Sequence, residues 1–326
     1  MRKISFLVGL LSFLVLHTNA QQSKLFSNFS TDENIIYDIC FTHNGGAIGI
    51  ADGKSVKVYS METIKLIRNF KNEHRKQILS IDISADSTLL VSGGKDSTIV
   101  IWDFKEGRLL KSMKAEGIVT SVSVSPDSRY LAYGGSDHKV SLFDITNEKL
   151  VAVFAEHSDD ITSIAFSPGG DYIAASSGDN LITVYGNGAL VSELSGHKDF
   201  VRDISFDSDG TKLISCGDDG NVIIWDISDI ENPKVLEESK RGSDWLLSVD
   251  FHPDNETYAF AGFSGNIEII SQNVHYKTSM KVPVNKVLFT LDERHFLTIV
   301  AATRGKGVLL MSTNRMLQSK KDPKVN

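Results

Sequence analysis

The sequence of 326 residues has little cysteine and only one long apolar run. Both features limit the classes of protein to which it can belong. Cys40 and Cys216 are the two cysteines, so a framework of several disulfides, common in exported proteins, is excluded. The apolar run Ile4–Leu16 has 13 residues, short of the ~20 that span a bilayer as a stable anchor. No linker, low-complexity tract or long run of one charge divides the chain. We therefore expect one folded domain.

Short motifs of several enzyme classes are absent as well. The sequence has no H-E-x-x-H and no G-x-S-x-G, and DGKS at residues 52–55 has Ile48 where a phosphate-binding loop needs its first glycine. Five further histidines show no mutual metal-ligand spacing. These are His43, His138, His252, His275 and His295. The sequence therefore predicts no catalytic residue, no metal site and no cofactor.

Basic residues are neither in excess nor clustered in the body of the chain. Lys and Arg number 34 against 41 Asp and Glu, which gives a net charge of −7. The one basic cluster belongs to a short tail, residues 320–326. Because nucleic-acid binding needs clustered Lys and Arg, we expect no nucleic-acid partner.

The first twenty residues have the layout of a secretory signal. Arg2 and Lys3 precede the apolar run, and the small residue Ala20 ends the segment. We expect cleavage after Ala20, which would leave Gln21 first, change the net charge from −7 to −9 and remove any stable membrane span. This predicts an exported protein, either periplasmic or extracellular. An uncleaved anchor is the alternative.

What the chain does contain is a repeat of about forty residues. The stretch DDGNVIIWD at 218–226 has a near copy, KDSTIVIWD, at 95–103. Seven strand-like runs end at matching positions, 40 to 45 residues apart. These positions are Tyr59, Trp102, Phe143, Tyr185, Trp225, Ile270 and Met311. Each unit holds four short alternating runs separated by turn residues, which is typical of antiparallel strands.

The unit Ser195–Asp226 resembles a WD40 repeat. It has the Gly196–His197 pair, an aspartate before its third strand, and a Trp–Asp ending. The resemblance covers roughly residues 24–316. It is weakest in the first unit and in the last two, and in the last two it depends on spacing alone. It implies an all-β fold, a seven-bladed β-propeller of four-stranded antiparallel blades, over residues 21–319. Either KLFSNF (24–29) or NRMLQS (314–319) could complete the last blade.

The resemblance also implies a buried hydrogen-bonded network in the two best-matched units. The two sets are Asp219, His197, Ser215 and Trp225, and Asp96, His74, Ser92 and Trp102. Asp, His and Ser also occur together in hydrolases, but here they recur in register with the repeat, so we interpret them as structural. Two units are incomplete. The unit ending at Tyr185 keeps His157 and Asp179 but has Ala175 in place of the hydroxyl, and the unit ending at Phe143 keeps Asp137 but has Ala115 in place of histidine.

Cys40 and Cys216 would lie in the first and fifth blades, too far apart for a disulfide. We expect both to be buried free thiols. Repeat alignment also places one residue per blade on the channel wall. These residues are Asp38, Ser80, Ser121, Ser163, Asp203, Ser248 and Lys286. Such a ring predicts a polar channel lining without a metal site.

Aromatic and arginine residues should gather on one rim of the propeller. The candidates are Phe200, Arg202, Asp218, Trp245 and Lys95. Because aromatic and Arg side chains are enriched among interface anchors, we predict a monomeric, non-catalytic scaffold that binds an unidentified protein partner. Trp245 could instead fold inward, where Gly242 replaces a histidine. The alternative function is a lactonase-like or quinoprotein-like enzyme with its site in the channel.

Overall fold

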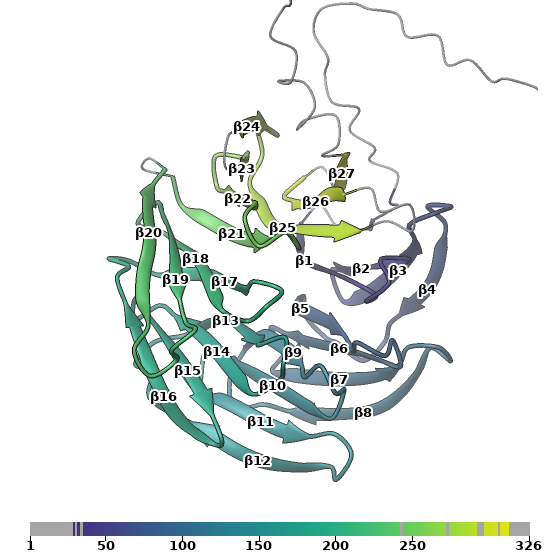
Figure 1. Ribbon diagram of the computed structural model, residues 1–326. Helices are drawn as coiled ribbons and strands as arrows, with labels where there is room; N and C mark the ends of the chain where they lie inside the picture. Colours follow the sequence, from purple (N-terminus) through teal and green to yellow (C-terminus); the bar gives the residue numbers. More distant parts are fainter. Residues whose placement is uncertain are drawn as a thin grey trace, which may run out of the picture.

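The computed structural model describes residues 29, 31–32, 35–241, 244–271, 274–291, 297–305 and 307–312. Within these residues the chain forms 27 strands in seven antiparallel sheets, arranged in a ring (Figure 1). The first strands of successive sheets contact one another around the centre, and β25 contacts β1 to close the ring. The described residues contain no helix long and apolar enough to cross a membrane.

Six sheets have four strands each, in chain order from the centre outward. Sheet 1 is β1 (Ile36–Phe41), β2 (Ala47–Asp52), β3 (Ser55–Ser60) and β4 (Leu66–Phe70). Sheet 2 is β5 (Ile78–Ile83), β6 (Leu89–Gly94), β7 (Thr98–Asp103) and β8 (Arg108–Lys114). Sheet 3 is β9 (Val119–Val124), β10 (Tyr130–Gly135), β11 (Val140–Asp144) and β12 (Lys149–Phe154).

The second half of the ring continues the same pattern. Sheet 4 is β13 (Ile161–Phe166), β14 (Tyr172–Ser177), β15 (Leu181–Gly186) and β16 (Ala189–Ser195). Sheet 5 is β17 (Val201–Phe206), β18 (Lys212–Gly217), β19 (Asn221–Asp226) and β20 (Lys234–Lys240). Sheet 6 is β21 (Leu246–Phe251), β22 (Tyr258–Gly262), β23 (Asn266–Ser271) and β24 (Val274–Ser279). Sheet 7 is β25 (Val284–Leu291), β26 (Leu297–Thr303) and β27 (Val308–Ser312).

The predicted all-β propeller with four-stranded antiparallel blades is confirmed, but the predicted number of such blades is not. Six blades have four strands, and sheet 7 has three in the described residues. Both segments considered for its fourth strand, 24–29 and 314–319, lie outside the described residues except for Phe29. The leader 1–20 and the tail 320–326 also lie outside them.

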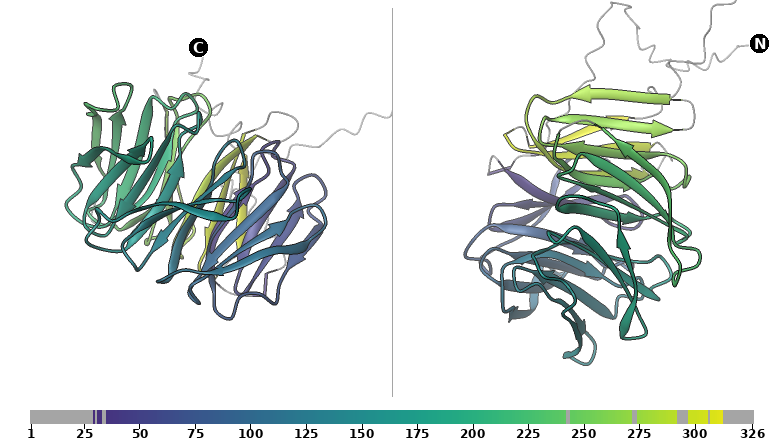
Figure 2. Two further views of the ribbon diagram at one scale, coloured as in Figure 1. Left: turned by 90° about the horizontal axis from the view of Figure 1, so that it is seen from below. Right: turned by 90° about the vertical axis from the view of Figure 1, so that its left-hand side faces the viewer.

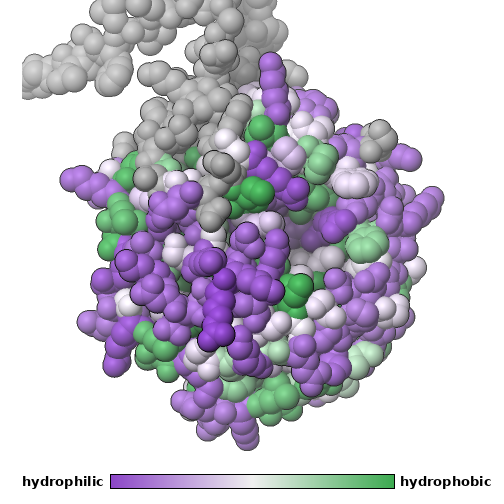
Figure 3. All heavy atoms as spheres, turned by 180° about the vertical axis from the view of Figure 1, so that it is seen from behind, coloured by the Kyte–Doolittle hydropathy of each residue, from purple (hydrophilic) through white to green (hydrophobic). Residues whose placement is uncertain are grey.

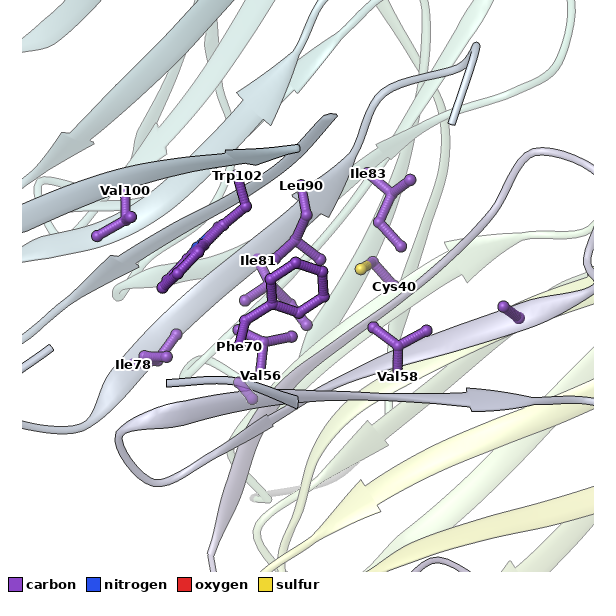
Figure 4. Close-up of a cluster of buried hydrophobic side chains, with 12 residues drawn as sticks. Cys40, Val56, Val58, Phe70, Ile78, Ile81, Ile83, Leu90, Val100 and Trp102 are labelled. Carbon is purple, nitrogen blue, oxygen red and sulfur yellow. The ribbon is translucent and has the colours of Figure 1, made fainter. Parts of the chain in front are cut away.

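Side chains pack between neighbouring sheets, so the core is divided into wedges rather than gathered at one centre. The residues of β5, the first strand of sheet 2, are buried or partly buried, whereas those of the outer strand β8 are exposed or partly buried. Between sheets 1 and 2, Phe70 packs edge-to-face on Trp102 with ring centroids 5.4 Å apart (Figure 4). Two further views show that neighbouring sheets lie face to face around the ring (Figure 2).

The strand-ending aromatics of the repeat are core residues. Trp102, Phe143, Tyr185 and Trp225 are all buried. Tyr185 stacks on Phe154, the last residue of the preceding outer strand, with centroids 4.1 Å apart. A large apolar residue at this position therefore holds two blades together by removing apolar surface from water.

The turns after the first strands require a left-handed backbone residue. Gly170 has φ 79° and Gly210 has φ 69°, a region that glycine enters without steric penalty. Ser87 and Ser128 adopt the same region at the matching places, with φ 54° and 60°. The Asp, Ser, Asn and Gly composition of these turns, visible in the sequence, reflects this geometry.

Candidate functional site

The two implied networks of four residues are joined by hydrogen bonds. In sheet 2, His74 Nδ1 lies 3.1 Å from Asp96 Oδ1, and His74 Nε2 lies 2.9 Å from Ser92 Oγ. The Trp102 indole N–H donates to the same Ser92 hydroxyl over 3.2 Å. Because indole only donates and carboxylate only accepts, the bonds run in one direction, and His74 carries its proton on Nδ1.

Sheet 5 repeats this arrangement more tightly. His197 Nδ1 lies 3.0 Å from Asp219 Oδ2, His197 Nε2 lies 2.8 Å from Ser215 Oγ, and Trp225 Nε1 donates to Ser215 over 2.9 Å. Burial acts to raise the pKa of Asp219, but hydrogen bonds from His197 and from backbone amides hold it below its usual value. Ser215 is fully buried and also accepts the Trp225 indole N–H, so a substrate cannot reach this serine in the folded protein.

The network of sheet 4 contains a hydroxyl that the sequence analysis did not assign. Ala175 occupies the expected place, yet His157 Nε2 lies 2.8 Å from Thr183 Oγ1. His157 Nδ1 lies 2.9 Å from Asp179 Oδ2, as in the other two networks. Thr183 lies on the third strand instead of the second. A threonine two residues before Tyr185 was the available sequence signal.

Sheet 1 has an ion-paired cluster where sheets 2, 4 and 5 have a histidine. Asp32 precedes the first strand by the same four residues as His74 and His197. Lys57 Nζ lies 2.9 Å from Asp32 Oδ1 and 2.8 Å from Asp52 Oδ2, and both Lys57 and Asp52 are buried. Sequence reasoning missed this cluster because its residues match no WD40 position by type. In sheet 3, Asp137 accepts one long bond, 3.4 Å, from the Lys139 amide.

Three of the predicted rim residues form one cluster. The Arg202 guanidinium binds both carboxylate oxygens of Asp218, with Nε 2.7 Å from Oδ1, and lies over the Phe200 ring, 5.0 Å from its centroid. The Arg202 side chain is 33% exposed, whereas Asp218 is 7% exposed. Arg202 is therefore held in one orientation and keeps part of its surface available.

Trp245 faces solvent. It is 51% exposed and packs edge-to-face on Phe263, itself 46% exposed, with centroids 5.6 Å apart. Arg304 lies over Phe263, 5.7 Å from the ring centroid. The inward alternative for Trp245 is therefore wrong, since a Trp that filled core volume would be buried. Phe263 and Arg304 follow the second strands of their sheets, and sequence reasoning had not singled them out.

Arg202 and Tyr37, the partner of Lys95, lie at one mouth of the central channel. Lys95 Nζ donates to the Tyr37 hydroxyl over 3.1 Å and lies over its ring. Tyr37, Arg202 and Leu247 line a cavity of about 120 Å³ at this end of the channel. Leu247 follows Trp245 by two residues, so Trp245 lies close along the chain to this cavity. Figure 3 shows that one face of the ring is mainly hydrophilic, with separate small apolar areas.

The ring of polar channel residues links neighbouring first strands. Asp38 Oδ2 accepts the Ile81 amide over 2.9 Å, Ser121 Oγ accepts the Ile164 amide over 2.9 Å, and Ser248 Oγ accepts the Val287 amide over 3.1 Å. Each bond joins a channel side chain of one sheet to the backbone of the next. The channel lining thus holds the ring together, because it satisfies amides that the ladder hydrogen bonds leave unpaired.

Asp203 is the hub of this ring. Its carboxylate accepts the hydroxyls of Ser163 and Ser248 at 2.9 and 2.7 Å. Lys286 Nζ lies 2.9 and 3.0 Å from its two oxygens, which connects sheet 7 to sheet 5 past sheet 6. Burial acts to lower the pKa of Lys286, but the charges of Asp203 and Asp38 outweigh it and raise that pKa.

The larger part of the channel is acidic. A cavity of about 500 Å³ is lined by Asp38, Asp82 and Asp250 together with Lys286 and serines of the ring. Burial raises the pKa of Asp38 and Asp250 to about 6 and that of Asp82 to about 7. These three carboxylates accept backbone amides, so they serve the ring as well as the cavity.

The described part of the structure also contains two buried cysteines and one group of potential metal ligands. Cys40 and Cys216 are buried free thiols, and burial raises the pKa of both. Among the described residues, a single group of three has ligand atoms within 4.8 Å of one another: His138, Asp159 and Asp160. Sequence reasoning saw no metal-ligand spacing at His138, because its neighbours come from the next sheet.

Similarity to known proteins agrees with this geometry. Four stretches, residues 64–103, 107–144, 148–185 and 188–226, match the model described as WD domain, G-beta repeat. Each holds the outer strand of one sheet and the first three strands of the next.

Similar curated proteins share the same kind of segment. Nuclear distribution protein PAC1 of Arthroderma otae is 32% identical over 181 residues, 51% of this chain and 39% of that protein. The 77 kDa echinoderm microtubule-associated protein of Strongylocentrotus purpuratus is 24% identical over 173 residues, 51% of this chain and 25% of that protein. Apoptotic protease-activating factor 1 of Rattus norvegicus is 27% identical over 232 residues, 69% of this chain and 18% of that protein. The chain spans well under half the length of each of these relatives. The four matched repeats and these similarities show that the chain belongs to the WD40-repeat family.

Proposed function

We propose that the protein is a non-catalytic scaffold that binds a protein partner through the rim around the smaller channel mouth. The exposure of Trp245 is the observation that supports this proposal most directly. Its side chain is 51% exposed and packs on Phe263 beside Arg304. A large exposed aromatic pair flanked by a guanidinium has the composition of an interface anchor. The Phe200–Arg202–Asp218 cluster extends this surface, and its internal ion pair holds the arginine in place before binding.

The family supports this proposal in general terms. WD40 proteins generally act as scaffolds for protein interactions. The relatives' names, a microtubule-associated protein and a nuclear distribution protein, refer to those proteins and to chains much longer than this one. For this chain we therefore propose only a protein partner, without naming it.

The alternative, an enzyme with its site in the channel, has weaker support. The cavity of about 500 Å³ would admit a small molecule. Its carboxylates, however, already accept backbone amides, and Asp203 is bound to Lys286. Groups occupied in holding the ring together are less available for acid–base chemistry.

The test compares two equally exposed side chains. Trp245 on the rim and Leu150 on the outer strand β12 are each 51% exposed. The partner is first captured from an envelope extract with the wild-type chain and identified, and its affinity is then measured for Trp245→Ala and Leu150→Ala. We expect Trp245→Ala to weaken binding by about 30-fold, or about 2 kcal/mol, without lowering the unfolding midpoint. Equal affinities for both variants would show that the partner uses another surface.

We also propose that sheet 7 receives a fourth strand from the segment that ends at Phe29, giving seven four-stranded blades. Phe29 is buried and packs on Tyr59, with centroids 5.1 Å apart. It shares a cluster with Ala302 and Val308 of sheet 7 and with residues of sheet 1. Phe70 and Phe154, which end outer strands, make the same kind of contact with the following sheet.

Export is a further proposal, supported by the leader alone. Arg2, Lys3, the apolar run and Ala20 have the order of a cleavable signal. Mass spectrometry of the protein from its native source should find Gln21 as the first residue. An intact Met1 in the membrane fraction would exclude cleavage.

A further inference from the structure

Three potential metal ligands meet on the rim between sheets 3 and 4. His138 lies in the turn between β10 and β11, and Asp159 and Asp160 lie in the loop between β12 and β13. One ligand atom from each residue lies within 4.8 Å of the other two. The three residues come from two neighbouring sheets, so the ring, and not the local sequence, brings them together.

The distance between two of these atoms suits a tetrahedral metal ion. His138 Nε2 lies 3.3 Å from Asp160 Oδ1. Two ligand atoms at the usual zinc distances of about 2.0–2.1 Å are separated by about 3.4 Å when the coordination is tetrahedral. An ion between the imidazole and the carboxylate therefore needs little movement of either side chain.

The loop that carries the two aspartates is anchored. The Asp160 carbonyl accepts the Gly178 amide over 3.0 Å, the Asp159 carbonyl accepts the Ser177 hydroxyl over 3.1 Å, and Asp159 Oδ1 accepts the Asp160 amide over 2.7 Å. A side chain at Gly178 would lie 2.6 Å from the Phe200 ring and 3.0 Å from the Asp159 carboxyl carbon. Asp159 thus lies close to Phe200, and hydrogen bonds fix the backbone of both aspartates.

Charge and accessibility also favour a cation. Two adjacent carboxylates carry two negative charges, and within the described part of the chain His138 is the one basic group that ion-pairs with either of them. The side chains of His138 and Asp160 are 43% and 48% exposed, so an ion can reach them from solvent. An imidazole with two carboxylates suits Zn²⁺ and similar transition metals, whereas Ca²⁺ takes six to eight oxygen ligands.

We propose that His138, Asp159 and Asp160 form a surface site for a divalent transition-metal ion, of which Zn²⁺ is the reference case. Three protein ligands leave the fourth tetrahedral position to water or to a group from another molecule. The site does not depend on the protein partner proposed above, and its test requires no partner.

Calorimetric titration of the metal-free full chain with zinc chloride tests the site. The variants are His138→Ala and Asp160→Asn, and His275→Ala is the control, since His275 is 53% exposed and lies 2.7 Å from a single carboxylate, Glu268. We expect wild type and control to bind one more zinc ion than His138→Ala, or to bind it at least about tenfold more tightly, because removal of even an outer-shell partner weakens metal sites 10- to 100-fold. Asp160→Asn, which keeps the shape of the residue, should weaken binding in the same direction.

Three outcomes would overturn the proposal. The first is a wild-type chain that binds no zinc at millimolar concentration. The second is a set of superimposable isotherms for wild type and both site variants, each with an unchanged unfolding midpoint in the absence of metal. The third is calcium that binds at the same site more tightly than zinc, which would contradict the assigned ion class.

Discussion

At the scale of single residues, the partners of buried polar atoms decide what each side chain does. Ser215 Oγ accepts the Trp225 indole N–H and lies 2.8 Å from His197 Nε2, so one hydroxyl satisfies two buried groups. A network of this kind stabilises the fold only when every member has a partner, because an unpaired buried group costs about 1–3 kcal/mol. Substitutions at matching repeat positions should therefore differ according to the bonds each residue makes.

Asp219→Ala should destabilise the protein more than Asp137→Ala. Asp219 accepts bonds from His197 Nδ1 and from the amides of Lys198 and Asn221, whereas Asp137 accepts one long bond from Lys139. We expect losses in the free energy of unfolding of about 3 kcal/mol and less than about 1 kcal/mol, respectively. Urea unfolding of the two variants measures both, and equal losses would show that the network contributes little.

The channel carboxyls should make stability depend on pH. Because burial raises the pKa of Asp82 to about 7, the folded chain binds a proton more tightly than the unfolded chain. The stability that this carboxyl contributes is present at low pH and is lost as the pH rises through about 7. Asp82→Asn stays neutral, so its stability relative to wild type should rise by about 1–2 kcal/mol from about pH 5 to about pH 8, with some screening by channel water. Denaturant unfolding at both pH values measures this, and a constant difference would argue against it.

At the scale of the elements, different strands supply the same hydrogen-bonding function. In sheets 2 and 5 the hydroxyl comes from the second strand, through Ser92 and Ser215, while in sheet 4 it comes from the third, through Thr183. The two strands are paired, with Thr183 opposite Ala175. A hydroxyl on either the second or the third strand can therefore reach the histidine of the network.

Thr183→Val should destabilise the protein by about 1–2 kcal/mol. Valine keeps the shape of threonine but leaves His157 Nε2 without a partner, and the His157 side chain is 1% exposed. Ala175→Ser in the Thr183→Val background returns a hydroxyl to the position of Ser92 and Ser215, and we expect it to restore part of the loss. Thermal or urea unfolding of the single and double variants gives the comparison. A single variant as stable as wild type would exclude the role of Thr183.

At the scale of the whole molecule, closure of the ring depends on contacts between its two ends. β25 contacts β1, and the Asn285 side-chain amide of β25 donates to the Ile36 carbonyl of β1 over 2.7 Å. Phe29 adds an apolar contact between sheets 7 and 1. In a repeat protein each unit packs only against its neighbours, so contacts at the junction of the first and last units decide whether the ring holds together.

Phe29→Ala should destabilise the protein as much as Phe154→Ala. Both side chains are 6% exposed and pack on an aromatic residue of the following sheet. We expect each substitution to lower the free energy of unfolding by about 3–5 kcal/mol. Denaturant unfolding of the two variants provides the measurement. If Phe29→Ala were as stable as wild type, the proposed closure by the segment ending at Phe29 would be wrong.

Strands, turns and repeat period were all accessible from the sequence, because they depend on interactions within about forty residues. Alternating apolar residues, turn residues at fixed places and strand-ending aromatics indicated the propeller and the networks of Asp219 and Asp96. The sequence left open which terminal segment completes sheet 7, and both candidates lie outside the described residues except for Phe29.

Tertiary structure alone decided the contacts between residues distant in sequence. The Lys286–Asp203 pair spans 83 positions, and His138 meets Asp159 and Asp160 only because two sheets lie side by side. The orientation of a side chain likewise depended on the tertiary structure. Trp245 had two plausible orientations in the sequence, and the structure places it in solvent beside Phe263. The physical reason is common to all three cases: a local pattern determines which strand or turn a residue belongs to, whereas its neighbours across the ring depend on how the sheets pack.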